Sequence, residues 1–338
     1  MSTGPNEFLE YYLNWHAPAT SALQDAKSVS LPVEASRVSN VVFCGMGGSG
    51  AAGLYVAHLL SEEAGIPSQV VPYYKPPAYV GRDTLVFAVS FSGNTMETLS
   101  CALRALERGA RLVAVTRGGR LERAARDKGF PAVIVPPAPA PRAGFPGLLF
   151  AILGVLGGSG LLDLSSLGVN DALEMLSNAE TTMAEAVRLA GWLARVASER
   201  RPLVVLSGYS TLPVGVRVKN EIAENMKYPS MVGAVPESGH NDIEAWSSTP
   251  NAGFLVLPVN DDVEKVMLDA LLDAVGPETK YIVRGSENRS PIPFLLWPTW
   301  VSGIATVKAA LELGVDPVGI ARIGMYKKSW TSKVDLSG

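Results

Sequence analysis

The sequence is poor in cysteine and histidine, with two Cys and three His among 338 residues. Cys44 and Cys101 lie far apart in the chain and belong to no CxxC or Cys/His spacing. Disulfide frameworks and zinc sites depend on such spacings, so the sequence argues against both. We expect the two cysteines to be buried and reduced.

An excess of charge of either sign is also missing. The 29 Lys and Arg residues stand against 32 Asp and Glu residues, which leaves a formal net charge of −3. Such a balance gives no bulk attraction to nucleic acid or to an anionic membrane. An anionic substrate would therefore have to be held by local devices such as glycine loops and helix N-termini.

Long uninterrupted apolar runs are absent from the sequence, because Gly, Pro or polar residues break the longest ones. The N-terminal stretch MSTGPNEFLEYYLNWH has no basic region followed by an apolar one. Transmembrane helices and secretory signals need those features. We expect a soluble cytoplasmic protein that binds neither nucleic acid nor membrane.

The chain is longer than one hydrophobic core usually supports, so we expect two α/β domains, residues 1–150 and 151–338. Short β-branched runs alternate with helical stretches in the first half, which is typical of a doubly wound parallel sheet. A Pro/Gly-rich connector at 136–147 leads into the second half. The predicted strands of the first half are Val41–Cys44, Leu85–Ser90, Arg111–Thr116 and Ala132–Val135.

The same alternation of strand-like and helical segments begins again at Pro202, which indicates a structural repeat without detectable sequence identity between the halves. A helical pattern at 171–197 separates the two. The predicted strands of the second half are Leu203–Ser207, Phe254–Pro258 and Lys280–Arg284. The predicted helices are Val214–Met226, Asp262–Ala274, Phe294–Leu313 and a short final one after Asp316-Pro317.

A glycine loop, GMGGSG at 45–50, directly follows the first predicted strand. Its spacing fits GxGxxG, but dinucleotide binding also requires an acidic residue after the next strand, and Gln69–Tyr74 has no carboxylate. The lysine of a phosphate-binding Walker loop is missing too. A tight turn without a ligand is the alternative to an anion site. The candidate phosphate contacts are Gly47, Gly48 and Ser49.

A second loop carries three hydroxyls where the strand Leu85–Ser90 meets a predicted helix at Met96. Hydroxyls, free backbone N–H groups and the positive end of a helix dipole can together hold a phosphate without Lys or Arg. The alternative is that Ser92 or Thr95 only caps the helix. The candidate phosphate contacts are Ser90, Ser92 and Thr95.

These two loops carry a resemblance to the sugar isomerase (SIS) domain family, through GMGGSG and SFSGNTMET. Within that family the sequence is most similar to the archaeal type of bifunctional phosphoglucose/phosphomannose isomerase. The motifs are KNEIAENMKYP at 219–229, PESGHNDIEAW at 236–246 and VDPVGI near the C-terminus. The resemblance therefore covers nearly the whole chain.

The resemblance implies two SIS domains, each a parallel sheet flanked by helices in three layers, and a homodimer with active sites at the subunit interface. It implies interconversion of glucose 6-phosphate, and of mannose 6-phosphate, with fructose 6-phosphate, with no cofactor and no metal. This reaction opens the sugar ring and moves a proton between C2 and C1 through a cis-enediolate. It needs a base, a ring-opening group and a positive charge.

Two carboxylates are candidates for the base. Glu221 and Glu224 lie three residues apart in one predicted helix, so they share roughly one face. A carboxylate can serve as base and then as acid when partial burial raises its pKa. The resemblance places the base at Glu224, and Glu221 remains the alternative. The alternative is that both glutamates pair with Lys219 and Lys227 on a solvated helix surface and have no catalytic role.

His240 and Arg142 are the next candidates. His240 lies in a polar loop at 237–242, where an imidazole that titrates near neutrality could move a proton to or from the ring oxygen. The resemblance implies that it reaches the active site of the partner subunit. Arg142 is a lone cation in the apolar connector, and the resemblance assigns it the enediolate charge. A surface histidine and a structural arginine are the alternatives.

The resemblance places a second ring-opening group at Lys327, with Lys328 one register away. The same register puts Ile320 where bifunctional members carry a threonine that is linked to tolerance of both C2 epimers. Either the alignment shifts here, or activity on mannose 6-phosphate is weaker than on glucose 6-phosphate.

Two other functions fit parts of the sequence. The phosphate loops would equally serve an isomerase of arabinose 5-phosphate or of a hexulose 6-phosphate, although those enzymes usually use single SIS domains. A sugar-phosphate-sensing regulator would need a helix-turn-helix module, and the residues before Val41 are too few and too acidic for one.

Overall fold

The computed structural model describes residues 4–31 and 33–334, and the chain divides into two compact units. We call residues Asn14–Ser166, together with the segment from Ile320 onward, the N-unit. We call residues Leu167–Gly319, together with the segment up to Leu13, the C-unit. Each unit contains its own parallel sheet.

These units differ from the expected ranges 1–150 and 151–338. Residue 150 lies inside α6 (Phe145–Gly158), an apolar helix whose residues from Phe145 to Leu156 are all buried. The Pro/Gly-rich connector therefore leads directly into a core helix of the N-unit rather than into a second domain. The terminal helices also differ from the expected assignment: α1 (Pro5–Leu13) is part of the C-unit, and α13 (Ala321–Thr331) is part of the N-unit.

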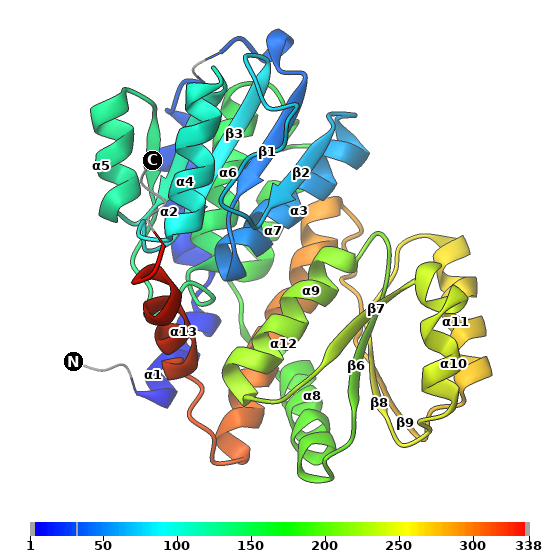
Figure 1. The fold of residues 1–338 in the computed structure, drawn as a ribbon. Helices are drawn as coiled ribbons and strands as arrows, with labels where there is room; N and C mark the ends of the chain where they lie inside the picture. Colours follow the sequence, from blue (N-terminus) through cyan, green and yellow to red (C-terminus); the bar gives the residue numbers. More distant parts are fainter. Residues whose placement is uncertain (1–3, 32, 335–338) are drawn as a thin grey trace. The chain divides into compact units, whose positions relative to one another are not determined.

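The N-unit contains a five-stranded parallel sheet in the order β2-β1-β3-β4-β5 (Figure 1). All four strands predicted in the first half are present. The strands are β1 (Asn40–Cys44), β2 (Ser68–Val71), β3 (Thr84–Ser90), β4 (Arg111–Thr116) and β5 (Ala132–Ile134). The remaining elements are α2 (His16–Lys27), η1 (Ala35–Arg37), α3 (Gly47–Glu63), α4 (Met96–Glu107) and α5 (Gly119–Lys128).

Both faces of this sheet are covered, as the continuous apolar strands require. Alternate residues such as Val42 and Val86 join a core with Cys101 and Ala105 of α4 and with α5. The other face meets α3 closely, since a Cβ on Gly53 would lie 2.7 Å from the Cβ of Phe43. The N-unit is therefore the expected three-layer α/β sandwich.

The C-unit contains a four-stranded parallel sheet in the order β7-β6-β8-β9. The sequence predicted three of these strands and missed β7. The strands are β6 (Leu203–Gly208), β7 (Met231–Val235), β8 (Gly253–Val256) and β9 (Thr279–Ile282).

Helices again cover both faces of the sheet (Figure 1). The face that carries Val204 and Phe254 packs on α11 and on Trp246 of α10. The predicted helix at 171–197 is two helices, α7 and α8. The helical elements are α7 (Val169–Leu176), α8 (Glu180–Ser198), α9 (Leu212–Glu221), η2 (Ile222–Met226), η3 (Glu237–His240), α10 (Asp242–Ser247), α11 (Asp262–Val275) and α12 (Pro291–Glu312).

Helix α12 is long and apolar enough to cross a membrane by length and composition. However, 83% of its most apolar stretch is buried inside the protein. It packs against α8 and α9 of the same unit. Helix α12 therefore has the burial of a core helix.

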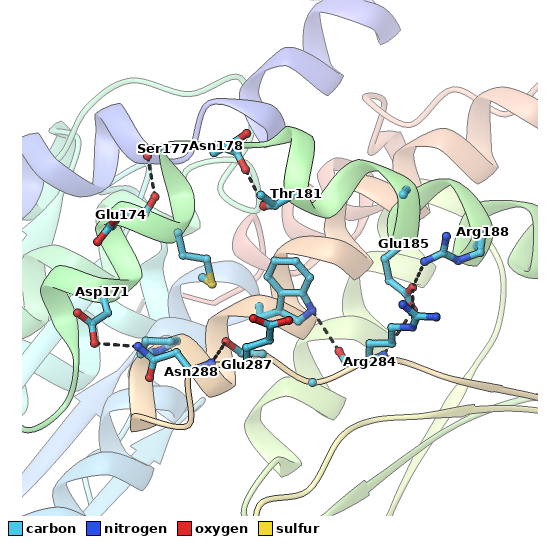
Figure 2. A pocket seen from close by; sticks show the side chains of 16 residues that line it. Asp171, Glu174, Ser177, Asn178, Thr181, Glu185, Arg188, Arg284, Glu287 and Asn288 are labelled. Atoms are coloured by element: carbon cyan, nitrogen blue, oxygen red, sulfur yellow. Dashed lines mark hydrogen bonds and ion pairs between the residues drawn. The ribbon is translucent and has the colours of Figure 1, made fainter.

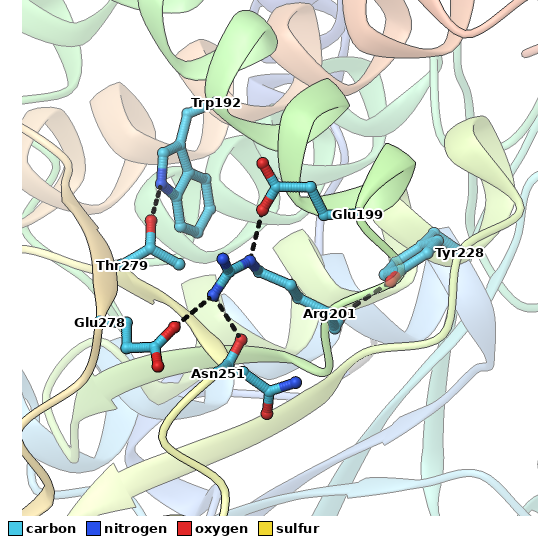
Figure 3. A network of polar contacts seen from close by, with 7 residues as sticks. All are labelled: Trp192, Glu199, Arg201, Tyr228, Asn251, Glu278 and Thr279. Carbon is cyan, nitrogen blue, oxygen red and sulfur yellow. Dashed lines mark hydrogen bonds and ion pairs between the residues drawn. The ribbon is translucent and has the colours of Figure 1, made fainter.

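A polar network joins the segments that precede the four strands of the C-unit (Figure 3). Arg201, just before β6, donates to Glu199 at 2.5 Å, to Glu278 at 2.9 Å and to the carbonyl of Asn251 at 3.2 Å. The hydroxyl of Tyr228 donates to the carbonyl of Arg201 at 2.6 Å. Because these groups lie at the amino ends of parallel strands, the network stabilises the edge opposite to the one where ligands bind in such sheets.

The two sheets share one strand order, since β2-β1-β3-β4 and β7-β6-β8-β9 both place the first strand of the unit second. The predicted structural repeat is therefore present. In the N-unit β2 is added on one side of β1 and β3 on the other, and in the C-unit β7 and β8 lie in the same way on the two sides of β6. The topological switch points therefore lie between β1 and β3 and between β6 and β8. Open α/β sheets bind ligands outside the carboxyl ends of the strands at such switch points.

Candidate active site

The glycine loop lies at the switch point of the N-unit, because it follows β1. Gly47 has a φ of +56° and begins α3. Ser49 is almost fully buried, and its Oγ accepts a hydrogen bond from the backbone N–H of Phe91 at 3.1 Å. The expected contact residue Ser49 thus joins the loop after β1 to the loop after β3.

Gly48 brings the connector to the same place. A Cβ at Gly48 would lie 3.0 Å from the carbonyl oxygen of Pro141 and 3.2 Å from the backbone nitrogen of Arg142. Only glycine allows this approach without displacing the connector. The glycine loop and the segment that carries Arg142 are therefore neighbours in the N-unit.

The Ser/Thr loop follows β3 on the other side of the switch point. Thr95 is the N-cap residue of α4, but within the described chain its side chain makes no capping hydrogen bond. The hydroxyl of Ser90 donates to that of Thr95 at 3.1 Å, and the exposed Ser92 accepts from the backbone of Asn94 at 3.3 Å. In the described structure the Thr95 hydroxyl therefore does not cap α4, and the Ser92 hydroxyl bonds the backbone just before the helix.

The Ser/Thr loop rests on the loop after β4. Gly93 has a φ of +65°, and its carbonyl accepts from the backbone N–H of Leu121 at 2.9 Å. A Cβ at Gly93 would lie 1.7 Å from the carbonyl oxygen of Gly118. This close contact holds the Ser/Thr loop against the loop after β4.

A hollow of about 470 Å³ opens beside Ser92 and Asn94 and is bounded by the connector residues Ala138–Pro141. Arg117, an exposed cation, also lines it. Sequence reasoning did not single out Arg117. The available signal was its place immediately after a predicted strand, at the carboxyl edge of the sheet.

Arg142 is 1% exposed, which agrees with a cation held at a defined place in an apolar segment. Lys327 and Lys328 both lie on α13 and are both exposed, so burial does not separate them. Ile320 is the N-cap residue of that helix.

In the C-unit, the predicted helix that carries both glutamates changes form at Ile222. Residues 222–226 form a π-helical turn, η2, and Lys227 closes it with a φ of 55°. Such turns widen the helix and are frequent at functional sites. The two glutamates differ in burial, since Glu221 is 1% exposed and Glu224 is half-buried.

Glu221 belongs to a buried polar network. Its Oε2 accepts from the hydroxyl of Tyr12 at 2.6 Å and from Nδ2 of Asn225 at 2.6 Å, and its Oε1 forms an ion pair with Arg217. Asn225 also donates to Thr306 at 3.0 Å. The network ties α1, α9, η2 and α12 together within the C-unit.

Glu224 has a different setting from Glu221. The Nζ of Lys227 donates to its main-chain carbonyl at 2.5 Å. Lys219 bonds the amide oxygen of Asn220 at 3.3 Å. The predicted alternative of a solvated pair does not describe Glu221, whose ion-pair partner is Arg217.

His240 ends η3, shortly after β7, and is exposed. It borders a small hollow of about 270 Å³ with Ile243, Met267 and Leu271. The imidazole therefore stands at the carboxyl edge of the C-unit sheet with an apolar surface beside it.

The switch point of the C-unit already holds an anion from its own chain. Glu264 of α11 reaches the loop after β6, where it accepts from the backbone N–H of Ser210 at 2.9 Å and from the hydroxyl of Ser210 at 2.5 Å. This loop corresponds in strand order to the glycine loop of the N-unit. In the C-unit this loop therefore binds a carboxylate of its own chain.

The C-unit also has a larger hollow, of about 970 Å³, between α7, α8 and the loop after β9 (Figure 2). The buried Glu185 accepts there from Arg188 at 2.5 Å and from Tyr281 at 3.0 Å. Burial alone would raise the pKa of Glu185, but hydrogen bonds from Arg188, Tyr281 and the Arg284 backbone outweigh it and lower the pKa. Every expected site residue lies in the described ranges, and none of them lines this hollow.

No group of three or more His, Cys, Asp or Glu side chains that could hold a metal ion occurs among residues 4–31 and 33–334.

Comparison with known proteins gives two family matches. The SIS domain model matches residues 36–128, which span β1 to α5. The model of the bacterial phospho-glucose isomerase C-terminal SIS domain matches residues 183–329. A hypothetical protein from Thermus thermophilus has the same fold, with a TM-score of 0.71 and 17% identity over 98% of this chain and 91% of its own.

Two relatives resemble the chain over most of its length. It is 30% identical to D-glucosamine-6-phosphate 4-epimerase of Sulfolobus acidocaldarius, over 86% of this chain and 89% of the relative. It is 35% identical to the bifunctional phosphoglucose/phosphomannose isomerase of Aeropyrum pernix, over 94% of this chain and 96% of the relative. With two SIS-type sheets and this identity along nearly its whole length, the chain belongs to the family of bifunctional phosphoglucose/phosphomannose isomerases.

Proposed function

We infer that this protein is an aldose–ketose isomerase that interconverts glucose 6-phosphate and mannose 6-phosphate with fructose 6-phosphate. The observation that carries the inference is the 35% identity to an enzyme of that name across 94% of the chain. The N-unit adds a physical reason, because two loops suited to a phosphate flank one switch point.

We propose that the phosphate binds at the N-unit switch point. Ser90, Ser92 and Thr95 would supply hydroxyl donors, and the first turns of α3 and α4 would supply backbone N–H groups. Helix N-termini favour a dianion through their partial positive charge. The remaining expected contacts are Gly47, Gly48 and Ser49.

The proposed chemistry assigns one role to each of four side chains. Glu224 takes the proton from C2 or C1 of the open-chain sugar and returns it to the neighbouring carbon. Arg142 stabilises the negative charge of the cis-enediolate. His240 and Lys327 move protons at the ring oxygen and the C1 or C2 hydroxyl during ring opening. The half-buried setting of Glu224 supports its role as a base, whereas Glu221 is 1% exposed and is held by Tyr12, Asn225 and Arg217.

Activity on both aldoses follows from the intermediate. Glucose 6-phosphate and mannose 6-phosphate differ only at C2, and the planar enediolate has lost that configuration. Return of the proton to either face of C2 gives one aldose or the other. Ile320, in place of a hydroxyl side chain, leads us to expect weaker turnover of mannose 6-phosphate.

We further propose a cytoplasmic homodimer in which His240 serves the active site of the partner subunit. The exposed position of His240 at the end of η3, beside an apolar hollow, supports a role at a surface that another copy covers.

A substrate comparison tests the proposed function. Purified protein would be offered glucose 6-phosphate, mannose 6-phosphate or glucosamine 6-phosphate, with and without a chelator, and the products would be identified by coupled assay and chromatography. We expect fructose 6-phosphate from the first two, unaffected by the chelator. Turnover of glucosamine 6-phosphate alone, with C4 epimerisation, would instead align the chain with its epimerase relative.

Replacing Gly93 by alanine is expected to raise the KM for sugar phosphate about tenfold or more, equivalent to at least about 1.4 kcal/mol. The added Cβ would overlap the carbonyl of Gly118 and displace the Ser/Thr loop from the loop after β4. Gly65→Ala is the matched control, since Gly65 has a similar φ of +62° with nothing within 4 Å of a Cβ. Equal KM values for the two variants would show that the contact between Gly93 and Gly118 does not affect substrate binding.

A further inference from the structure

The two cysteines, far apart in sequence, meet in the core of the N-unit. Cys44 is the last residue of β1 and Cys101 lies in α4, and both are fully buried. Their Sγ atoms are 2.8 Å apart. The expected burial is therefore confirmed, but no sequence spacing had indicated that the two side chains touch.

The elements that carry the two thiols hold them in place. Cys44 and Cys101 belong to one apolar core, together with Val42 and Val86 of the sheet and Ala105 of α4. The Sγ separation exceeds a covalent S–S bond of roughly 2.05 Å by less than about 1 Å. The fold therefore brings the two thiols close to bonding distance.

We propose that Cys44 and Cys101 are an oxidation site, at which a small-molecule disulfide converts the two thiols into one intramolecular disulfide bond. One cysteine thiolate attacks the oxidant and forms a mixed disulfide, which releases the first small thiol. The second cysteine then attacks the protein sulfur of that mixed disulfide and releases the second small thiol. Two protein thiols are oxidised, one small disulfide is reduced to two thiols, and the two protons pass to the released thiols.

The position of this bond gives it a structural consequence. Cys44 directly precedes the glycine loop, and Cys101 lies six residues after Thr95 in the helix that follows the Ser/Thr loop. A bond between them ties the strand before one loop to the helix after the other. It also closes a long loop of chain, and such cross-links stabilise by restricting the unfolded state.

Burial of the two thiols controls the rate at which they are oxidised. The hydrogen bond to Cys101 and the loss of water around Cys44 raise the pKa of the Cys44 thiol well above its usual value. Because the thiolate is the nucleophile, the folded protein reacts slowly and reacts faster as warming opens the core. Once formed, the bond is shielded from external thiols in the same way.

The test is a time course of the full-length protein with glutathione disulfide at several temperatures below its melting point. Intact mass and thiol titration in denaturant are the readouts. We expect the two thiols to disappear with loss of two hydrogen atoms and no retained glutathione. The oxidised protein should melt at least about 4 °C above its reduced form, as a cross-link of this size predicts.

Cys101→Ser is the matched control, since it removes one sulfur and keeps the size of the side chain. This variant is expected to form no internal bond, to retain at most one glutathione and to show the same Tm with and without oxidant treatment. The proposal is overturned if the wild type keeps both thiols at every temperature, if it retains two glutathione adducts, or if its oxidised form melts no higher than its reduced form.

Discussion

Glu224→Gln is expected to lower kcat for isomerisation of glucose 6-phosphate by about 10²- to 10⁴-fold, the usual contribution of a general base. The amide keeps the shape of the side chain but cannot take a proton from carbon. The measurement is coupled detection of fructose 6-phosphate at saturating substrate. KM should change little, because the proposed phosphate contacts lie in the N-unit loops.

Glu312→Gln is the control for this variant, since it neutralises an exposed carboxylate of the same unit at the end of α12. It should leave kcat and KM unchanged. A Glu224→Gln enzyme that turns over at the rate of this control would refute the assignment of Glu224 as the base.

Glu221→Ala is expected to act on stability, with a loss of about 3–5 kcal/mol in the free energy of unfolding. The substitution removes the carboxylate that pairs with the buried guanidinium of Arg217 and that accepts hydrogen bonds from Tyr12 and Asn225. The measurement is urea unfolding of the purified protein, followed by hydrogen exchange of peptides from α1 and α9. Increased exchange should be concentrated in those two helices.

A double variant separates loss of the ion pair from loss of packing. Glu221→Leu combined with Arg217→Met replaces both charges by apolar side chains, and it should be more stable than Glu221→Ala, because breaking a buried pair costs more than removing it whole. If Glu221→Ala instead folds with unchanged stability and has lost turnover, Glu221 is the base and the roles of the two glutamates are reversed.

The strands and the two loops that we propose to bind phosphate were predictable because their signals are local. Val41–Cys44 and Leu85–Ser90 are apolar runs that end in glycine or hydroxyl residues, and parallel strands bring such ends to one edge. Strand β7 was missed because Met231–Val235 is a half-exposed edge strand with a glycine at its centre. Its apolar pattern is therefore weak.

The relations that the sequence could not supply depend on three-dimensional packing. The π-helical turn at 222–226 places Glu221 and Glu224 in different environments, and a 3.6-residue period contains no signal for that extra width. The contact between Cys44 and Cys101 and the carboxylate of Glu264 at Ser210 join segments more than fifty residues apart. The connector resembles a linker by composition, yet it leads directly into the buried helix α6.

Conversion of fructose 6-phosphate in D₂O, followed by proton NMR, is the decisive test that the protein isomerises hexose 6-phosphates through a cis-enediolate. A base that removes a C1 proton and exchanges it with solvent before protonating C2 will leave deuterium at C2 of the product. We expect glucose 6-phosphate and a smaller amount of mannose 6-phosphate to appear, with solvent deuterium at C2 in those turnovers in which the base exchanges its proton before returning it. Absence of both aldoses would contradict isomerisation through a cis-enediolate.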